Sequence, residues 1–88
     1  MTEETEGVWL VERDYNDKGL VTLVYATPDG ERAVQQHKSS TMLSKQGVTA
    51  ATEVTTDKLR PVEEDDRRER YATEASRVAD RNDPDDEI

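Results

Sequence analysis

His37 is the only histidine in a chain without cysteine, so it is the one side chain suited by type to general acid–base catalysis near neutral pH. A catalytic histidine usually needs an orienting carboxylate, and the nearest acids along the sequence are Glu31 and Glu53. No recognisable motif ties a serine or a carboxylate to this histidine. We therefore interpret His37 as an ordinary polar strand residue, and we expect no catalytic residues and no enzymatic activity.

Two acidic clusters, at residues 63–66 and 83–87, contain the oxygen ligands that Mg²⁺ and Ca²⁺ prefer. The first cluster is explained by the start of a helix, where carboxylates meet the positive end of the helix dipole. The second lacks the glycine of a calcium-binding loop and contains Pro84. The glycines are scattered, so no phosphate-binding loop is present. We expect no specific metal site and no cofactor.

A stretch without carboxylates, residues 32–52, interrupts a chain in which 21 acids outnumber 12 bases. Its cationic or titratable residues are Arg32, His37, Lys38 and Lys45. As a binding surface, these side chains would contact the carboxylates of a partner protein or the phosphates of a nucleic acid. Alternatively, the stretch lacks acids because much of it is buried. The sequence leaves both interpretations open.

Trp9 is the only tryptophan, and it neighbours Leu10 in a predicted strand, where successive side chains point to opposite faces. If Leu10 faces the core, Trp9 lies on the other face and becomes a candidate anchor for a partner. The reverse arrangement makes Trp9 the largest core residue. We favour the reverse arrangement because the chain has no phenylalanine to fill the core.

The composition favours a cytoplasm at molar salt. The net charge is -9, arginine outnumbers lysine, and only 32% of the residues are hydrophobic. At 1 M salt the Debye length is about 3 Å, so such a charge no longer repels strongly. No basic, apolar targeting segment is visible, and the longest apolar run, residues 8–11, is far too short to span a membrane. We expect a cytoplasmic protein that contacts no membrane.

Four segments with β-branched or aromatic residues between turn signals are predicted strands: residues 8–15, 20–27, 31–38 and 48–55. The turn at residues 28–30, Pro-Asp-Gly, is the strongest of these signals. A short helix is expected after the hydroxyl residues 39–41 and should end at Gly47. Pro61 is expected to begin the longest helix, with Leu59 tucked inward before it.

These elements predict a small α+β domain in the order β-β-β-α-β-α. Three strands form an antiparallel meander that a fourth strand joins, and the C-terminal helix packs on the sheet. The folded domain is expected to span residues 8–81, between a disordered segment at residues 1–7 and a disordered acidic tail at residues 82–88. An open edge on the third strand would permit a weak homodimer; otherwise we expect a monomer.

Residues 21–32 and 69–77, together with the closing Asp-Pro-Asp-Asp-Glu, resemble a group of short, acidic, uncharacterised haloarchaeal proteins. The resemblance extends from about Val8 to the C-terminus. It implies a halophilic archaeal cytoplasm and carries over no activity, cofactor or partner.

The absence of catalytic machinery and the acid-free stretch together favour a non-catalytic protein-interaction or regulatory module, whose partner is an unidentified protein. Its candidate binding residues are Trp9, Arg32, His37, Lys38 and Lys45. The alternative is a nucleic-acid-binding accessory protein that uses residues 32–52. High salt argues against this alternative, because counterion release drives phosphate binding and its contribution falls as salt rises.

Overall fold

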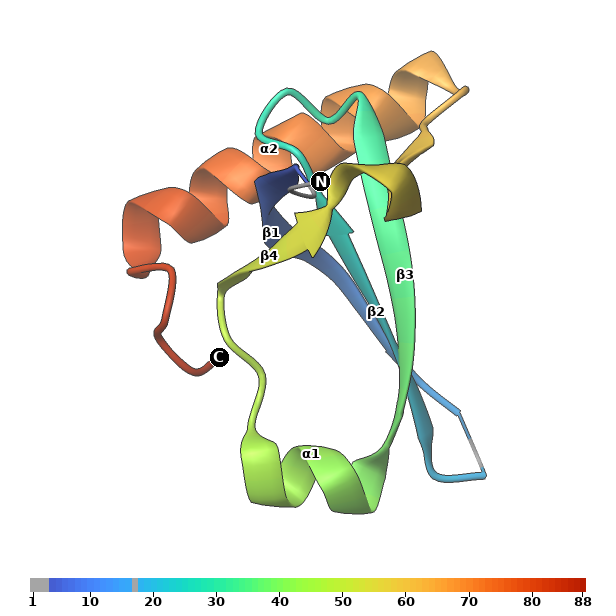
Figure 1. Cartoon of the computed structure of the whole chain (residues 1–88), viewed down its shortest axis with the longest axis vertical. Helices are drawn as coiled ribbons and strands as arrows, with labels where there is room; N and C mark the ends of the chain where they lie inside the picture. The colour runs from blue at the N-terminus through green and yellow to red at the C-terminus, as the bar shows by residue number, and fades with distance from the viewer. Residues whose placement is uncertain (1–3, 17) are drawn as a thin grey trace.

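The computed structural model describes residues 4–16 and 18–88, without the side chains of residues 44–46. It confirms the predicted small α+β domain and adds one short strand (Figure 1). The elements follow in the order β1 (Thr5–Tyr15), β2 (Leu20–Ala26), β3 (Arg32–Ser39), α1 (Ser40–Gln46), β4 (Ala51–Thr55), a 3-10 turn η1 (Thr56–Lys58), β5 (Arg60–Pro61) and α2 (Asp65–Arg81).

All strand pairs are antiparallel, and the order across the sheet is β4-β1-β2-β3-β5. The meander of β1, β2 and β3 forms the centre, as predicted. After α1, the chain returns to pair β4 with the outer edge of β1. β5 then pairs with β3 at Arg32 and Ala33 only.

The two faces of the sheet carry separate apolar clusters. The first, which we call the core face, contains Val8, Leu10, Val21, Leu23, Tyr25, Val48, Val54 and Leu59. The second, which we call the helix face, brings Val24 and Ala26 against Val62 and the α2 residue Tyr71. In Figure 1, α2 lies across this face over β1 and β2. Most of β3 is left uncovered on the helix face, where Gln35 and His37 are exposed.

Leu10, not Trp9, points into the core, which is the reverse of the arrangement that we favoured. Leu10 is 6% exposed, whereas Trp9 is half-buried on the helix face opposite Ala26. Val8 and Leu10 share a face by alternation, and these two branched side chains decide which face of β1 turns inward. A β-bulge follows, in which Val11 is the additional residue.

The long helix begins at Asp65 instead of Pro61. Pro61 ends β5 at the outer edge of the sheet, where its missing amide removes no bond between central strands. Leu59, just before β5, is buried on the core face as expected. Tyr71 and Ala75, one helical turn apart, bury the inner side of α2.

Both terminal segments take part in the sheet region, although composition predicted disorder there. β1 begins at Thr5, and the Thr56 amide donates to the carbonyl of Glu4; residues 1–3 lie outside the described part. The tail runs beside residues 48–51, whose amides and carbonyls need partners before β4 begins. The amides of Ala50 and Ala51 donate to the tail at 2.8 and 2.9 Å.

No helix in the described residues is long and apolar enough to cross a membrane.

Candidate functional site

The predicted cationic surface of residues 32–52 does not form one cluster. Arg32 lies on the core side of the sheet and forms an ion pair with Glu6. Lys38 faces the same side, opposite Val21, at the other end of β3, about 20 Å away along the strand. The side chain of Lys45 lies outside the described part of the structure.

His37 and Trp9, the other two predicted residues, lie on the helix face but not beside each other. His37 is exposed on β3, and its Nδ1 is 3.2 Å from the hydroxyl of Thr22. Among the described residues, no carboxylate forms an ion pair with this histidine. Trp9 lies at the β1–β4 side of the sheet, where it lines a separate apolar hollow of about 410 Å³ with Pro28 and Pro84.

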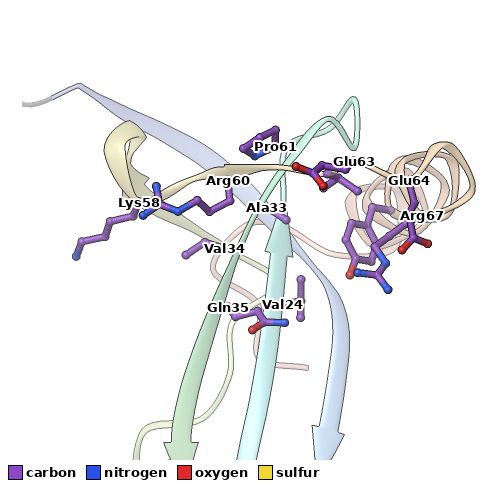
Figure 2. A pocket seen from close by; sticks show the side chains of 12 residues that line it. Val24, Ala33, Val34, Gln35, Lys58, Arg60, Pro61, Glu63, Glu64 and Arg67 are labelled. Carbon is purple, nitrogen blue, oxygen red and sulfur yellow. The ribbon is translucent and has the colours of Figure 1, made fainter.

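A larger hollow, of about 500 Å³, lies between β3, β5 and the first turn of α2 (Figure 2). We call it the β3 hollow. Its floor is formed by apolar side chains: Val24, Ala33, Val34, Pro61, Val62 and Tyr71. Its polar lining is Gln35, Lys58, Arg60, Glu63, Glu64 and Arg67.

Three cations of the β3 hollow have no ion pair in the described part of the chain: Lys58, Arg60 and Arg67. Among the described residues, the one hydrogen bond of their side chains runs from Arg60 to the carbonyl of Asp57, at 3.2 Å. Figure 2 shows Lys58 and Arg60 on the outer side of β3 and Arg67 on the α2 side. Glu63 and Glu64 are labelled on the α2 side with Arg67, so the positive charge of the hollow is concentrated at Lys58 and Arg60.

Tyr71 anchors the α2 wall of the β3 hollow. Its hydroxyl donates to Glu12 Oε2 at 3.2 Å, and Arg70 approaches the other oxygen of that carboxylate at 3.8 Å. Burial raises the pKa of Tyr71, and the charge of the neighbouring Glu12 raises this pKa further. The helix wall is therefore attached to β1 by a buried aromatic ring and one hydrogen bond.

Tyr71→Phe should lower the free energy of unfolding by about 1 kcal/mol at neutral pH, because the hydrogen bond to Glu12 is lost. Because folding raises the pKa of Tyr71, this residue stabilises the fold at pH values below its ordinary pKa, near 10. That stabilisation is lost as the pH rises through the pKa of the folded state. Between neutral pH and about pH 11, the free energy of unfolding measured with urea should therefore fall less for the variant than for the parent. An equal alkaline loss in both proteins would contradict this role.

Tyr15→Phe is the matched control, because Tyr15 is 63% exposed. This variant should unfold at the same urea concentration as the parent, within error, at neutral pH.

The donors that line the β3 hollow suit anionic groups. These donors are two guanidinium groups, one ammonium and one amide, which suit carboxylate or phosphate oxygens. In the described chain, no group of three or more His, Asp or Glu side chains is placed to hold a metal ion.

The β3 hollow shares only part of its lining with the predicted acid-free stretch. Ala33, Val34 and Gln35 belong to the acid-free stretch, but Lys58, Arg60 and Arg67 come from later segments. One sequence feature could have indicated these cations. Lys58 and Arg60 flank the inward Leu59, and Asp57 is the one acid next to them in the sequence.

The chain is a small α+β domain with a meander-based antiparallel sheet, one covering helix and a cation-lined hollow beside β3 and β5. The chain belongs to DUF7967, a family of unknown function that matches residues 2–88. No curated protein and no solved structure matches it.

Proposed function

We propose that the protein is a non-catalytic interaction module of a haloarchaeal cytoplasm, and that it binds an acidic segment of a partner protein in the β3 hollow. One observation carries this proposal: three cations without ion pairs surround an apolar floor in a chain with a net charge of -9. In so acidic a protein, cations that stabilise the fold would be expected beside carboxylates, as Arg32 is beside Glu6.

The floor adds a second requirement for the ligand. Val24 and Tyr71 are buried, whereas Ala33 and Val34 are partly exposed to the hollow. A ligand that covers this floor gains about 25 cal/mol for each Å² of apolar surface removed from water. The favoured segment is therefore amphipathic, with apolar side chains toward the floor and carboxylates toward Lys58 and Arg60.

Nucleic acid is the less favoured ligand. Counterion release, which drives phosphate binding, contributes little at molar salt. A stacked base would need an exposed aromatic face, but the one aromatic residue of the hollow, Tyr71, is 5% exposed.

The test is fluorescence anisotropy in molar KCl with a short labelled peptide that alternates valine and aspartate. The double variant Lys58→Gln and Arg60→Gln should bind this peptide roughly tenfold more weakly than the parent, since each exposed charge contact contributes about 0.5–1 kcal/mol. Circular dichroism and the urea midpoint should show that the variant is folded.

Lys18→Gln with Arg81→Gln is the matched control, because it removes the same charge from two exposed cations outside the hollow. The control should bind the peptide as the parent does. Equal weakening in both double variants would show a general charge effect and contradict the site. A labelled oligodeoxythymidylate that binds more tightly than the peptide in molar KCl would assign the hollow to nucleic acid instead.

A further inference from the structure

β3 has a free edge next to the β3 hollow. Only Arg32 and Ala33 pair with β5, and no other described strand pairs with the outer side of β3. The turn η1 carries the chain away before Leu59 can continue the pairing. Val34–Ser39 therefore forms an edge about 20 Å long without a neighbouring strand.

The direction of the backbone groups along this edge follows from the hydrogen bonds at both ends of the β2–β3 pair. The Thr27 amide donates to the Arg32 carbonyl, and the Ser40 amide donates to the Gly19 carbonyl. In an antiparallel pair, alternate residues then direct their amide and carbonyl toward β2. The even-numbered residues of β3 bond β2, and the amides and carbonyls of Gln35 and His37 point outward.

Native sheets usually block such an edge with a proline, a bulge or inward-pointing charges. Within Val34–Ser39 there is no proline, and the register with β2 has no shift. The charged side chain that this edge directs to the core side, Lys38, lies opposite Val21 at the end away from β5, so residues 34–37 carry none of these blocking features. Gln35 and His37, whose backbone amides and carbonyls point outward, are exposed. The edge is therefore open to a further strand.

The β3 hollow lies beside this edge and not only above one face. Ala33, Val34 and Gln35 all line it, although consecutive strand side chains point to opposite faces. A hollow that touches three consecutive residues must lie along the side of the strand. Figure 2 shows the same arrangement, with Val34 directed to one side of the β3 ribbon and Gln35 to the other.

The position of the cations favours one strand direction. β5 runs antiparallel to β3, so a strand that continues the line of β5 in the same direction ends beside Arg60 and Lys58. An antiparallel segment would place its carboxyl end there, next to two cations without ion pairs. A parallel segment would place its amino end there, and like charges would repel.

Molar salt favours the same binding mode. At 1 M salt the Debye length is about 3 Å, so attraction at longer range contributes little to binding. The remaining contributions are direct contacts: backbone hydrogen bonds, buried apolar surface and charge-assisted hydrogen bonds at contact distance. Strand addition supplies all three at this edge.

We propose that the acidic segment binds as an additional β strand, antiparallel to Val34–Ser39, with its carboxyl end held by Lys58 and Arg60. This inference rests on the proposed function, because it describes how the same hollow binds its ligand. It names the ligand more narrowly: an extended partner segment with a free or acidic carboxyl end.

The first experiment compares the valine–aspartate peptide with a copy whose amides on one side are N-methylated. The two peptides have the same side chains and charge. The methylated copy can pair with β3 only through its other edge, which turns its valines away from the floor of the hollow. Its affinity for the parent protein in molar KCl should be at least tenfold lower. Amidation of the carboxyl terminus of the unmethylated peptide should weaken binding by a smaller factor, about threefold to tenfold.

Amide hydrogen exchange followed by NMR locates the new bonds. The amides of Gln35 and His37 should exchange rapidly in the free protein and slowly with the peptide bound. The amides of Val34 and Gln36, which already bond β2, should change little. Gln35→Pro removes an outward amide without removing a bond to β2, so it should abolish binding and leave the urea midpoint nearly unchanged.

The outcomes separate the two proposals. Equal binding of both peptides, with Gln35 and His37 still exchanging rapidly, would overturn strand addition and leave side-chain binding in the hollow intact. Absence of binding by either peptide would overturn the proposed function as well. Protection of Gln35 and His37 that appears without peptide and rises with protein concentration would assign the edge to a second copy of this chain.

Discussion

Gly30→Ala should destabilise the fold more than any other single methyl group added to a glycine of this chain. Gly30 has φ of 72°, in the left-handed region, and a Cβ atom there would lie 2.8 Å from the amide nitrogen of Ala72. The carbonyl oxygen of Arg68 would be closer still. Both atoms belong to the backbone of α2, so no side-chain rotation relieves the contact, and the β2–β3 turn must move away from the helix.

The expected loss is about 4 kcal/mol or more, of which about 1–2 kcal/mol is the left-handed backbone and the rest is the displaced contact. That loss is a large part of the roughly 5–15 kcal/mol that stabilises a typical domain. Urea unfolding in molar KCl measures it. We expect a large fall in the midpoint, or a chain that is unfolded before urea is added.

Gly19→Ala is the matched control. Gly19 has nearly the same φ, 77°, but its Cβ would meet only the Ser40 hydroxyl at an ordinary 3.4 Å. Its loss should be about 1–2 kcal/mol, from the backbone alone. Similar losses at the two glycines would show that the contact between the turn and α2 does not contribute to stability.

Gly30 also shows how far local sequence can predict the fold. Pro28, Asp29 and Gly30 predicted the turn correctly, because turn chemistry is encoded within the turn itself. The same is true of α1, where Ser39 accepts a hydrogen bond from the Met42 amide and Gly47 ends the helix. The turn also packs against α2 at residues about forty positions later in the chain, and no local sequence pattern predicts that contact.

The incorrect predictions share this cause. Pro61 fits the first turn of a helix or the edge of a sheet equally well, and pairing with Arg32 decided between them. Trp9 was assigned to the core by size, whereas the alternation of Val8 with Leu10 decided the face. The disorder that composition predicts for residues 82–88 stays a prediction, although this tail exchanges backbone hydrogen bonds with residues 48–51.

The candidate site was the least predictable feature. Composition located a stretch poor in acids, and part of the floor, Ala33 to Gln35, does come from it. The cations were found only after β5 placed Arg60 beside β3 and α2 brought Arg67 to the same hollow. The residues of such a site come together only when β5 and the start of α2 pack beside β3, and the charge pattern along the chain does not predict that packing.

Salt should change the stability of the whole chain by several kcal/mol, and the geometry explains why. The molecule measures 36 × 31 × 25 Å, and its net charge is -9. Nine like charges about 20 Å apart form roughly 36 repelling pairs of about 0.2 kcal/mol each, or about 7 kcal/mol in unscreened water. The Debye length is about 30 Å at 0.01 M salt, so this repulsion acts across the whole fold there. At 1 M salt the Debye length is about 3 Å, and the repulsion is largely screened.

The urea midpoint should therefore rise steadily from dilute buffer to molar KCl, and circular dichroism should show a partly or wholly unfolded chain at the lowest salt. The unfolded chain keeps part of the same repulsion, so about 7 kcal/mol is an upper limit for the change in the free energy of unfolding. Sucrose at matched viscosity separates screening from a general solvent effect. A midpoint that does not depend on KCl would contradict both the electrostatic argument and the prediction of a halophilic protein.

Charge variants test whether the net charge itself is responsible. Glu69→Gln, Asp80→Asn and Asp85→Asn remove three exposed carboxylates that form no ion pair in the described chain, and they change the net charge from -9 to -6. The triple variant should fold at lower KCl than the parent. Lys18→Gln changes the net charge in the other direction, to -10, and should need slightly more salt. Because repulsion grows with the square of net charge, the shift should be larger for the triple variant than for Lys18→Gln and opposite in sign. Shifts in the same direction would instead assign the salt effect to specific ion binding.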